Sequence, residues 1–185
     1  MEVKTFFFQN CNIKLIWSAP QNLDRLDEDV LREDLYMVII VSACLVGENC
    51  KYNGKNNYKK RVLDFLEGHE IVTVCPEVMG GLPTPRPSCE IVNGRVININ
   101  GEDKTEFFYK GVSEAYNKIK DLDVKCAVLQ SRSPSCGVNQ IYDGSFSGTL
   151  ISGRGLFAEK LISLGYKVID SEDIWCIPIC RLDKS

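Results

Sequence analysis

The feature that most limits the possible folds is a series of short apolar runs that alternate with stretches of helical character. Residues 38–41 read Val-Ile-Ile-Val, a β-branched run of the kind found in strands buried on both faces. Strands are predicted at residues 38–41, 71–74, 126–129 and 166–169. Helices are predicted near 58–66 and over 155–164. This order predicts an α/β fold: a three-layer structure with a mainly parallel sheet and helices on both faces.

Three further patterns predict the remaining elements. Residues 105–122 carry apolar side chains at steps of four and three, which predicts one buried stripe along a helix. The stripe consists of Phe108, Val112, Ala115, Ile119 and Leu122. Asn93-Gly94 lies between two short β-like runs and predicts a tight hairpin, and Asp143-Gly144 suggests a second one. Residues 80–87 are rich in glycine and proline and predict an irregular loop.

The first 36 residues differ from the rest of the chain. They show weak periodicity, contain Pro20 and include an acidic helical stretch near residues 23–35. Residues 1–36 are predicted to be an N-terminal extension and residues 37–185 a single domain, since 185 residues suit one domain. Two interpretations stay open: either Met37 is the functional start, or residues 1–36 form a genuine extension packed on the domain.

The composition excludes several classes of protein. A hydrophobic share of 44% and a charged share of 25% are typical of a globular chain. The net charge of −3 is spread along the sequence without a basic stripe, so nucleic acid is not an expected partner. No apolar run approaches the roughly 20 residues that span a bilayer. Without a membrane segment or a signal peptide, we expect a cytoplasmic protein; the sequence does not indicate its oligomeric state.

Cysteine is abundant and histidine is rare. The chain has nine cysteines, an odd number that does not suit complete pairing, and reduced cytoplasmic cysteines favour metal binding or thiol chemistry. Its single histidine, His69, lies in a polar stretch and is predicted to be a solvated turn residue. A histidine-rich zinc site or a Cys-His nucleophile is therefore disfavoured.

Three cysteines follow predicted strands. Cys44 comes after the first strand, Cys75 after the second, and Cys136 after the third by a short loop. Because the carboxyl ends of parallel strands converge where ligands bind, these thiols are expected to meet in space. Soft thiolates select zinc, copper or iron-sulfur clusters, and three are too few to close a four-iron cluster, so one iron would stay open. The cysteines predicted instead to pack as small apolar residues are Cys126, Cys176 and Cys180.

Four motifs carry a resemblance to a known family. They are residues 41–47 (Val-Ser-Ala-Cys-Leu-Val-Gly), 50–54 (Cys-Lys-Tyr-Asn-Gly), 75–87 (Cys-Pro-Glu-Val-Met-Gly-Gly-Leu-Pro-Thr-Pro-Arg-Pro) and 132–137 (Arg-Ser-Pro-Ser-Cys-Gly). Over about residues 38–172 the chain resembles the thiouracil desulfidase (TudS-like) family, once catalogued as a domain of unknown function. The resemblance implies an oxygen-sensitive 4Fe-4S cluster with three cysteine ligands and one open iron. The positions that match the family's ligands are Cys44, Cys75 and Cys136.

The resemblance also implies a reaction. The open iron would bind the sulfur of a thiolated pyrimidine, such as thiouracil or a 4-thiouridine-type compound. Water would attack the attached carbon, and hydrosulfide would leave without net electron transfer. Glu77 and Ser133 are the candidates for the base and the proton shuttle, because each shares a loop with a ligand cysteine. The alternative role of Glu77 is to cap the following turn, and that of Ser133 is local hydrogen bonding at the Pro134 turn. Arg86 either binds an anionic part of the substrate or braces its loop.

Some positions depart from the family's pattern. Asn53 stands where the family usually has aspartate, Cys89 where a small apolar residue is common, and Gln130 where lysine is frequent. Substrate preference is therefore the property that transfers least. Relatives with an extra C-terminal domain act on thiolated transfer RNA, so a free base, nucleoside or nucleotide is the expected substrate here.

Two other functions are alternatives. One is a non-catalytic iron-sulfur or zinc-binding module for sulfur handling or redox sensing, in which Cys50 or Cys89 would be the fourth ligand. The other is a thiol oxidoreductase. It is disfavoured because Cys176 and Cys180 are separated by three residues and do not form a Cys-x-x-Cys pair.

Overall fold

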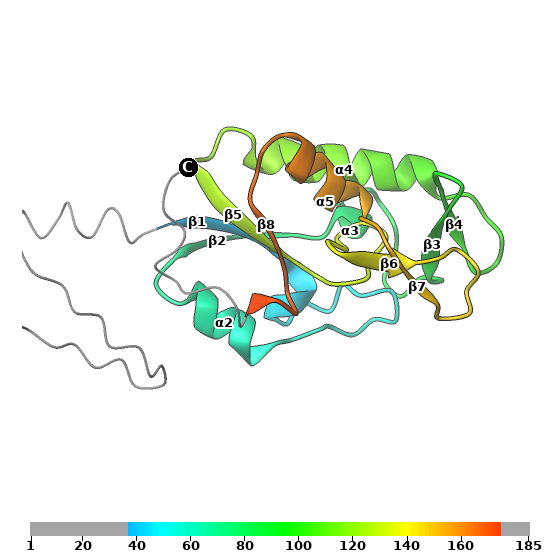
Figure 1. Cartoon of the computed structure of the whole chain (residues 1–185), viewed down its shortest axis with the longest axis horizontal. Helices are drawn as coiled ribbons and strands as arrows, with labels where there is room; N and C mark the ends of the chain where they lie inside the picture. The colour runs from blue at the N-terminus through cyan, green and yellow to red at the C-terminus, as the bar shows by residue number, and fades with distance from the viewer. Residues whose placement is uncertain (1–36, 175–185) are drawn as a thin grey trace, which may run out of the picture. The chain divides into compact units, whose positions relative to one another are not determined.

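A computed structural model of the chain describes residues 37–174, which form a four-stranded parallel sheet (Figure 1). The strand order is β2-β1-β5-β8, with β1 at Val38–Ser42, β2 at Glu70–Val74, β5 at Val124–Leu129 and β8 at Val168–Asp170. The predicted parallel sheet is confirmed, with small shifts in the strand ends. The predicted extension at residues 1–36 and the packing roles of Cys176 and Cys180 lie outside the described residues.

Helices cover both faces of this sheet. Figure 1 shows α4 (Thr105–Ile119) and α5 (Leu156–Ser163) along one face and α2 (Lys60–Leu66) on the other. Successive β1 side chains point to opposite faces, so Ile40 packs toward α4 and α5 while Ile39 packs toward α2. The three-layer prediction is therefore confirmed. No helix within residues 37–174 has the length and apolar character that a bilayer crossing requires.

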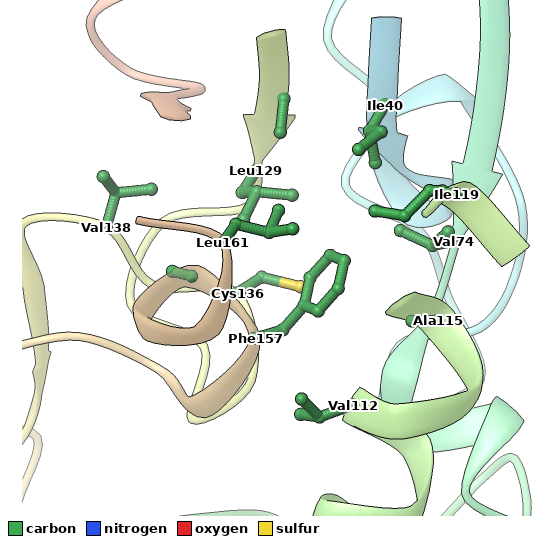
Figure 2. Packing of buried hydrophobic residues seen from close by; sticks show 12 residues of the cluster. Ile40, Val74, Val112, Ala115, Ile119, Leu129, Cys136, Val138, Phe157 and Leu161 are labelled. Atoms are coloured by element: carbon green, nitrogen blue, oxygen red, sulfur yellow. The ribbon is translucent and has the colours of Figure 1, made fainter. Parts of the chain in front are cut away.

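The core beneath α4 and α5 reaches the carboxyl edge of the sheet. Figure 2 shows Cys136 in this cluster, beside the ring of Phe157 from α5. Cys136 is 5% exposed, so one predicted ligand lies where the core meets the sheet edge. Cys126 is fully buried in the core on the other face, as the packing prediction requires.

Two antiparallel hairpins extend the domain beyond the sheet. β3 (Cys89–Val92) and β4 (Arg95–Asn98) are joined by Asn93 and Gly94, both with positive φ, as the turn signal predicted. β6 (Gln140–Tyr142) and β7 (Leu150–Ser152) are joined by residues 143–149, a longer connection than the predicted tight turn. The difference arises because this loop packs on β3 through hydrogen bonds to Glu90.

Three local predictions need correction. α4 ends at Ile119, and Leu122 is 39% exposed because the chain turns there to enter β5. A short helix that the sequence did not predict, α3 (Pro76–Met79), follows Cys75 directly. His69 is half-buried in the tight connection between α2 and β2, and its Nδ1 has no hydrogen-bond partner among the described residues. His69 thus lies in the predicted turn, but it is half-buried rather than fully solvated.

α3 and α4 cross with their backbones in contact. A Cβ added at Gly80 would overlap the carbonyl oxygen of Phe107, and one at Gly111 would overlap that of Pro76. Only glycine fits at either position, so the two backbones approach closely. Because α3 follows Cys75 and carries Glu77, this crossing sets the position of both residues.

We expect Gly111→Ala to lower the free energy of unfolding by about 1–3 kcal/mol, the usual cost of overpacking. Alanine favours a helix over glycine by about 1 kcal/mol, so propensity alone predicts the opposite sign. Urea denaturation measures the difference. Ser113→Ala, an exposed position on the same helix, is the control and should lose no stability. Equal or greater stability of the Gly111 variant would show that α3 can move away at little cost.

Candidate active site

A cavity of about 680 Å³ lies at the carboxyl ends of β1, β2 and β5. This volume falls within the range of small-molecule sites, about 300–1,000 Å³. Its lining includes the thiols of five cysteines: Cys44, Cys50, Cys75, Cys89 and Cys136. The structure thus brings the three sequence-predicted ligands to one cavity, together with two cysteines that were alternatives.

Local structure explains how the three predicted ligands reach this edge. Ser42 of β1 pairs in register with Val74 of β2, so the two strands end side by side. Cys44 lies in the 3₁₀ turn η1 (Ala43–Val46), and Cys75 follows Val74 directly. Gly47 ends η1 with φ 102°, a conformation that glycine adopts without strain. Cys136 arrives from the loop after β5.

Each predicted ligand has a neighbouring polar group. The side-chain amide of Asn57 donates to Cys44 Sγ at 3.6 Å, and the hydroxyl oxygen of Ser135 lies 3.7 Å from Cys136 Sγ. Cys75 Sγ donates to the carbonyl oxygen of Cys50 at 3.9 Å. A donor such as the Asn57 amide orients a metal-bound thiolate and tunes its basicity.

The thiols are poorly solvated. Burial raises the pKa of the Cys136 thiol to about 12. A hydrogen bond with the Cys50 side chain, followed by burial, raises the pKa of Cys75 above its ordinary value. Without a cation these thiols hold their protons, and a bound metal centre must displace those protons.

Cys50 and Cys89 differ in their relation to the predicted ligands. A hydrogen bond with Cys44 is the main cause that raises the pKa of Cys50 to about 11, and Cys50 also bonds with Cys75. Cys89 is half-buried and donates to the Pro87 carbonyl oxygen at 3.7 Å. Among the described residues, Cys50 therefore contacts two predicted ligands, whereas Cys89 contacts none of them.

Glu77 is held by a buried arginine. Arg86 Nε and Nη2 donate to Glu77 Oε2 at 2.9 and 2.7 Å, with side-chain exposures of 4% and 14% for the arginine and the glutamate. The remaining Arg86 donors bond to the Pro83 carbonyl, the Thr84 hydroxyl and the Cys50 carbonyl. All five guanidinium N–H groups therefore have acceptors. This arrangement supports loop bracing by Arg86 rather than binding of a substrate anion.

The second carboxylate oxygen of Glu77 faces two serines. Ser135 Oγ donates to Glu77 Oε1 at 3.0 Å, Ser133 Oγ lies 3.4 Å from the same oxygen, and the two hydroxyls are 2.9 Å apart. Among the described residues, both carboxylate oxygens of Glu77 therefore bond to side chains, and neither accepts a backbone N–H as a turn cap would. Ser133 Oγ also accepts hydrogen bonds from the backbone N–H groups of Ser135 and Cys136, each at 3.2 Å. This is the local hydrogen bonding predicted as the alternative role of Ser133.

Ser135 is a site residue that the sequence analysis missed. Its hydroxyl contacts Ser133, Glu77 and the sulfur of Cys136, and the residue is 1% exposed. The signal was present in the motif Arg-Ser-Pro-Ser-Cys-Gly, where Ser135 directly precedes Cys136. Aromatic residues on the cavity wall were also missed, since no motif marks them: Tyr52, Tyr58, Tyr142 and Phe146.

The family of the chain follows from a comparison of its sequence with family models. The model described as 2-thiouracil desulfurase matches residues 39–173, which include the whole sheet from Ile39 onward and the three predicted ligands. The chain belongs to the 2-thiouracil desulfurase family. The predicted resemblance to thiouracil desulfidases is thereby confirmed.

Two known proteins are similar to this desulfurase-family chain. The uncharacterized protein YbbK of Bacillus subtilis (strain 168) is 34% identical over 147 residues, covering 74% of this chain and 97% of that protein. The solved structure of the [4Fe-4S]-dependent thiouracil desulfidase TudS is 37% identical and superposes with a TM-score of 0.69. That match covers 74% of this chain and 92% of the other. Both relatives therefore correspond to this chain over nearly their full length.

Proposed function

We propose that this desulfurase-family protein is a 4Fe-4S-dependent desulfidase that removes sulfur from thiolated pyrimidines and releases hydrosulfide. Thiouracil and 4-thiouridine-type compounds are the proposed substrates. In this proposal Cys44, Cys75 and Cys136 hold the cluster. The carrying observation is that three thiols from three separate loops line one cavity beside the buried Arg86–Glu77 pair. Similarity to the [4Fe-4S]-dependent desulfidase TudS supports the same function.

The donor set fits an iron-sulfur cluster better than a single ion. Within residues 37–174, no three His, Cys, Asp or Glu side chains gather closely enough to hold one metal ion. A four-iron cluster spreads its cysteine ligands over different iron atoms, so its thiolates stand further apart. Soft thiolates are its usual ligands, and the cavity offers them without competing histidine.

The protein's own residues supply proton transfer. When bound, a cluster with one iron free of protein ligands would supply a Lewis acid for the thiocarbonyl sulfur. Arg86 fixes Glu77 Oε2, so Oε1 stays directed toward the serines and can accept a proton from the attacking water. Ser133 and Ser135, 2.9 Å apart, connect this carboxylate with the neighbourhood of Cys136. Water provides the new carbonyl oxygen and the one proton of the hydrosulfide, and its second proton leaves through Glu77 to solvent. The cleavage is therefore hydrolytic and needs no electron donor.

The proposed substrate is a small molecule. A cavity of about 680 Å³ is large enough for a free base, a nucleoside or a nucleotide.

A cytoplasmic location is proposed because the six cysteines of the described residues are all free, as expected in a reducing compartment.

Anaerobic purification with quantified iron and sulfide tests the proposal. The loaded protein is then incubated with 2-thiouracil, 4-thiouracil and 4-thiouridine monophosphate while released hydrosulfide is measured. We expect hydrosulfide and the corresponding oxygen compound in equal amounts from at least one substrate. A protein that carries the full cluster and is inactive on every thiocarbonyl would contradict the proposal.

The contact of Cys50 with Cys44 and Cys75 favours a second candidate, a cluster-binding module with four thiolate ligands and no open iron. Cys50→Ser separates the two functions. For the desulfidase we expect iron content and turnover near those of the unmodified protein, because three ligands remain. The non-catalytic module would lose one of its four ligands, so its iron content should fall below that of the unmodified protein, and it would release no hydrosulfide before or after the change. Cys89→Ser is the matched control, since Cys89 lines the same cavity without a hydrogen bond to another thiol in the described residues.

A further inference from the structure

The loop between β6 and β7 holds an aromatic residue in a backbone conformation that it does not favour. Phe146 has φ 58°, whereas the loop's other positive-φ positions, Gly144 and Gly148, are glycines with φ 89° and 84°. This left-handed region is sterically unfavourable for a residue with a bulky side chain and therefore destabilises the fold. Glycine and asparagine adopt it at little cost. Local stability would therefore select glycine or asparagine at position 146. The presence of phenylalanine calls for another reason.

A buried carboxylate fixes this loop. Glu90 of β3 is 8% exposed, and its Oε2 accepts the backbone N–H groups of Gly144 and Phe146, each at 3.0 Å. Burial of a carboxylate is costly unless strong hydrogen bonds compensate for it. A Cβ at Gly144 would lie 2.8 Å from the carbonyl oxygen of Ile91, so the loop rests directly on β3. The backbone of Phe146 is therefore held in place.

Phe146 is among the residues that line the cavity of the proposed ligands. Arg132, with φ 61°, is a second strained residue on this lining, and such strain collects at ligand-binding sites. Tyr52 and Tyr58 also line the cavity, but they are 43% and 55% exposed. Phe146 is half-buried and its backbone is anchored, so its ring is better fixed before a ligand arrives.

We propose that Phe146 is a substrate-binding residue whose ring stacks on the flat face of the thiolated pyrimidine, and that Glu90 is its positioning residue. This inference rests on the proposed function and names a contact within the same site. Stacking uses the π-face that every pyrimidine has, so it tolerates sulfur at either ring position. A ring that is already fixed loses little conformational freedom on binding.

Phe146→Ala in the cluster-loaded enzyme tests the stacking. We expect the KM for 2-thiouracil and the Kd for sulfur-free uracil, measured by equilibrium dialysis, each to rise at least about fivefold. Iron content should stay unchanged, and kcat should change less than KM. Phe146→Tyr keeps a flat ring and should restore binding. Tyr109→Ala removes an exposed aromatic side chain from α4, outside the cavity lining, and should change neither constant.

Phe146→Asn serves if the alanine variant does not fold, because asparagine tolerates positive φ. It should weaken binding to the same extent as alanine. Unchanged KM and Kd in the folded variant would overturn the stacking and leave the desulfidase function intact. A loaded enzyme that releases no hydrosulfide but binds uracil through Phe146 would overturn the desulfidase function alone. A loaded enzyme that binds neither uracil nor 2-thiouracil would overturn both.

Discussion

Cys136→Ser is expected to yield a colourless protein without desulfidase activity. Cys136 is one of the three proposed cluster ligands and lies 5% exposed at the meeting point of the core and the cavity. A serine hydroxyl is a harder donor than a thiolate and keeps its proton near neutral pH, so it does not replace the thiolate on iron. Iron and sulfide analysis after anaerobic reconstitution measures cluster content, and hydrosulfide release measures turnover. Both should fall to the background of protein without a cluster.

The control for this variant is Cys126→Ala. Cys126 lies in β5, ten residues before Cys136, and is also buried. Its side chain packs in the core and is not part of the cavity lining. The control should load iron and turn over normally. If Cys136→Ser keeps its colour while Cys126→Ala loses it, the proposed ligand set is wrong.

Glu77→Gln is expected to keep the cluster and lose turnover. Glutamine has nearly the same volume and can still accept a hydrogen bond from Arg86, but it cannot take a proton from water. Loss of a general base lowers kcat by about 10²–10⁴-fold. Steady-state kinetics on protein with verified iron content measures the effect. A variant that keeps its colour and loses its activity would show that Glu77 acts in proton transfer and not in cluster binding.

Asp64→Asn is the matched control, since this exposed carboxylate pairs with Lys60 on α2. It should leave kcat unchanged. Ser133→Ala and Ser135→Ala extend the test to the hydroxyls that bond to Glu77. Full activity of Ser133→Ala would show that this hydroxyl is not the proton shuttle, and full activity of Glu77→Gln would remove the carboxylate from the mechanism.

Much of the fold could be predicted because its signals are local. The β-branched run of β1, the stripe on α4 and the Asn93-Gly94 turn depend on neighbouring residues, and each formed nearly where the pattern indicated. The end of α4 and the short α3 were missed, since packing against other elements determined them. The α3–α4 crossing depends on Gly80 and Gly111, which are distant in sequence and carry no local signal of contact.

The candidate site divides in the same way. In the sequence, the alternation of strand and helix patterns determined the α/β class, and the short motifs determined the family. The strand-end cysteines determined the proposed ligands, because the carboxyl ends of parallel strands lie at one edge of the sheet. Only the tertiary structure showed that Arg86 uses every donor inside the protein, that Ser135 reaches Glu77 across 58 positions, and that Glu90 holds Phe146 at the cavity wall. These contacts join loops far apart in the chain. Their geometry depends on how the layers pack, which no local pattern of residues encodes.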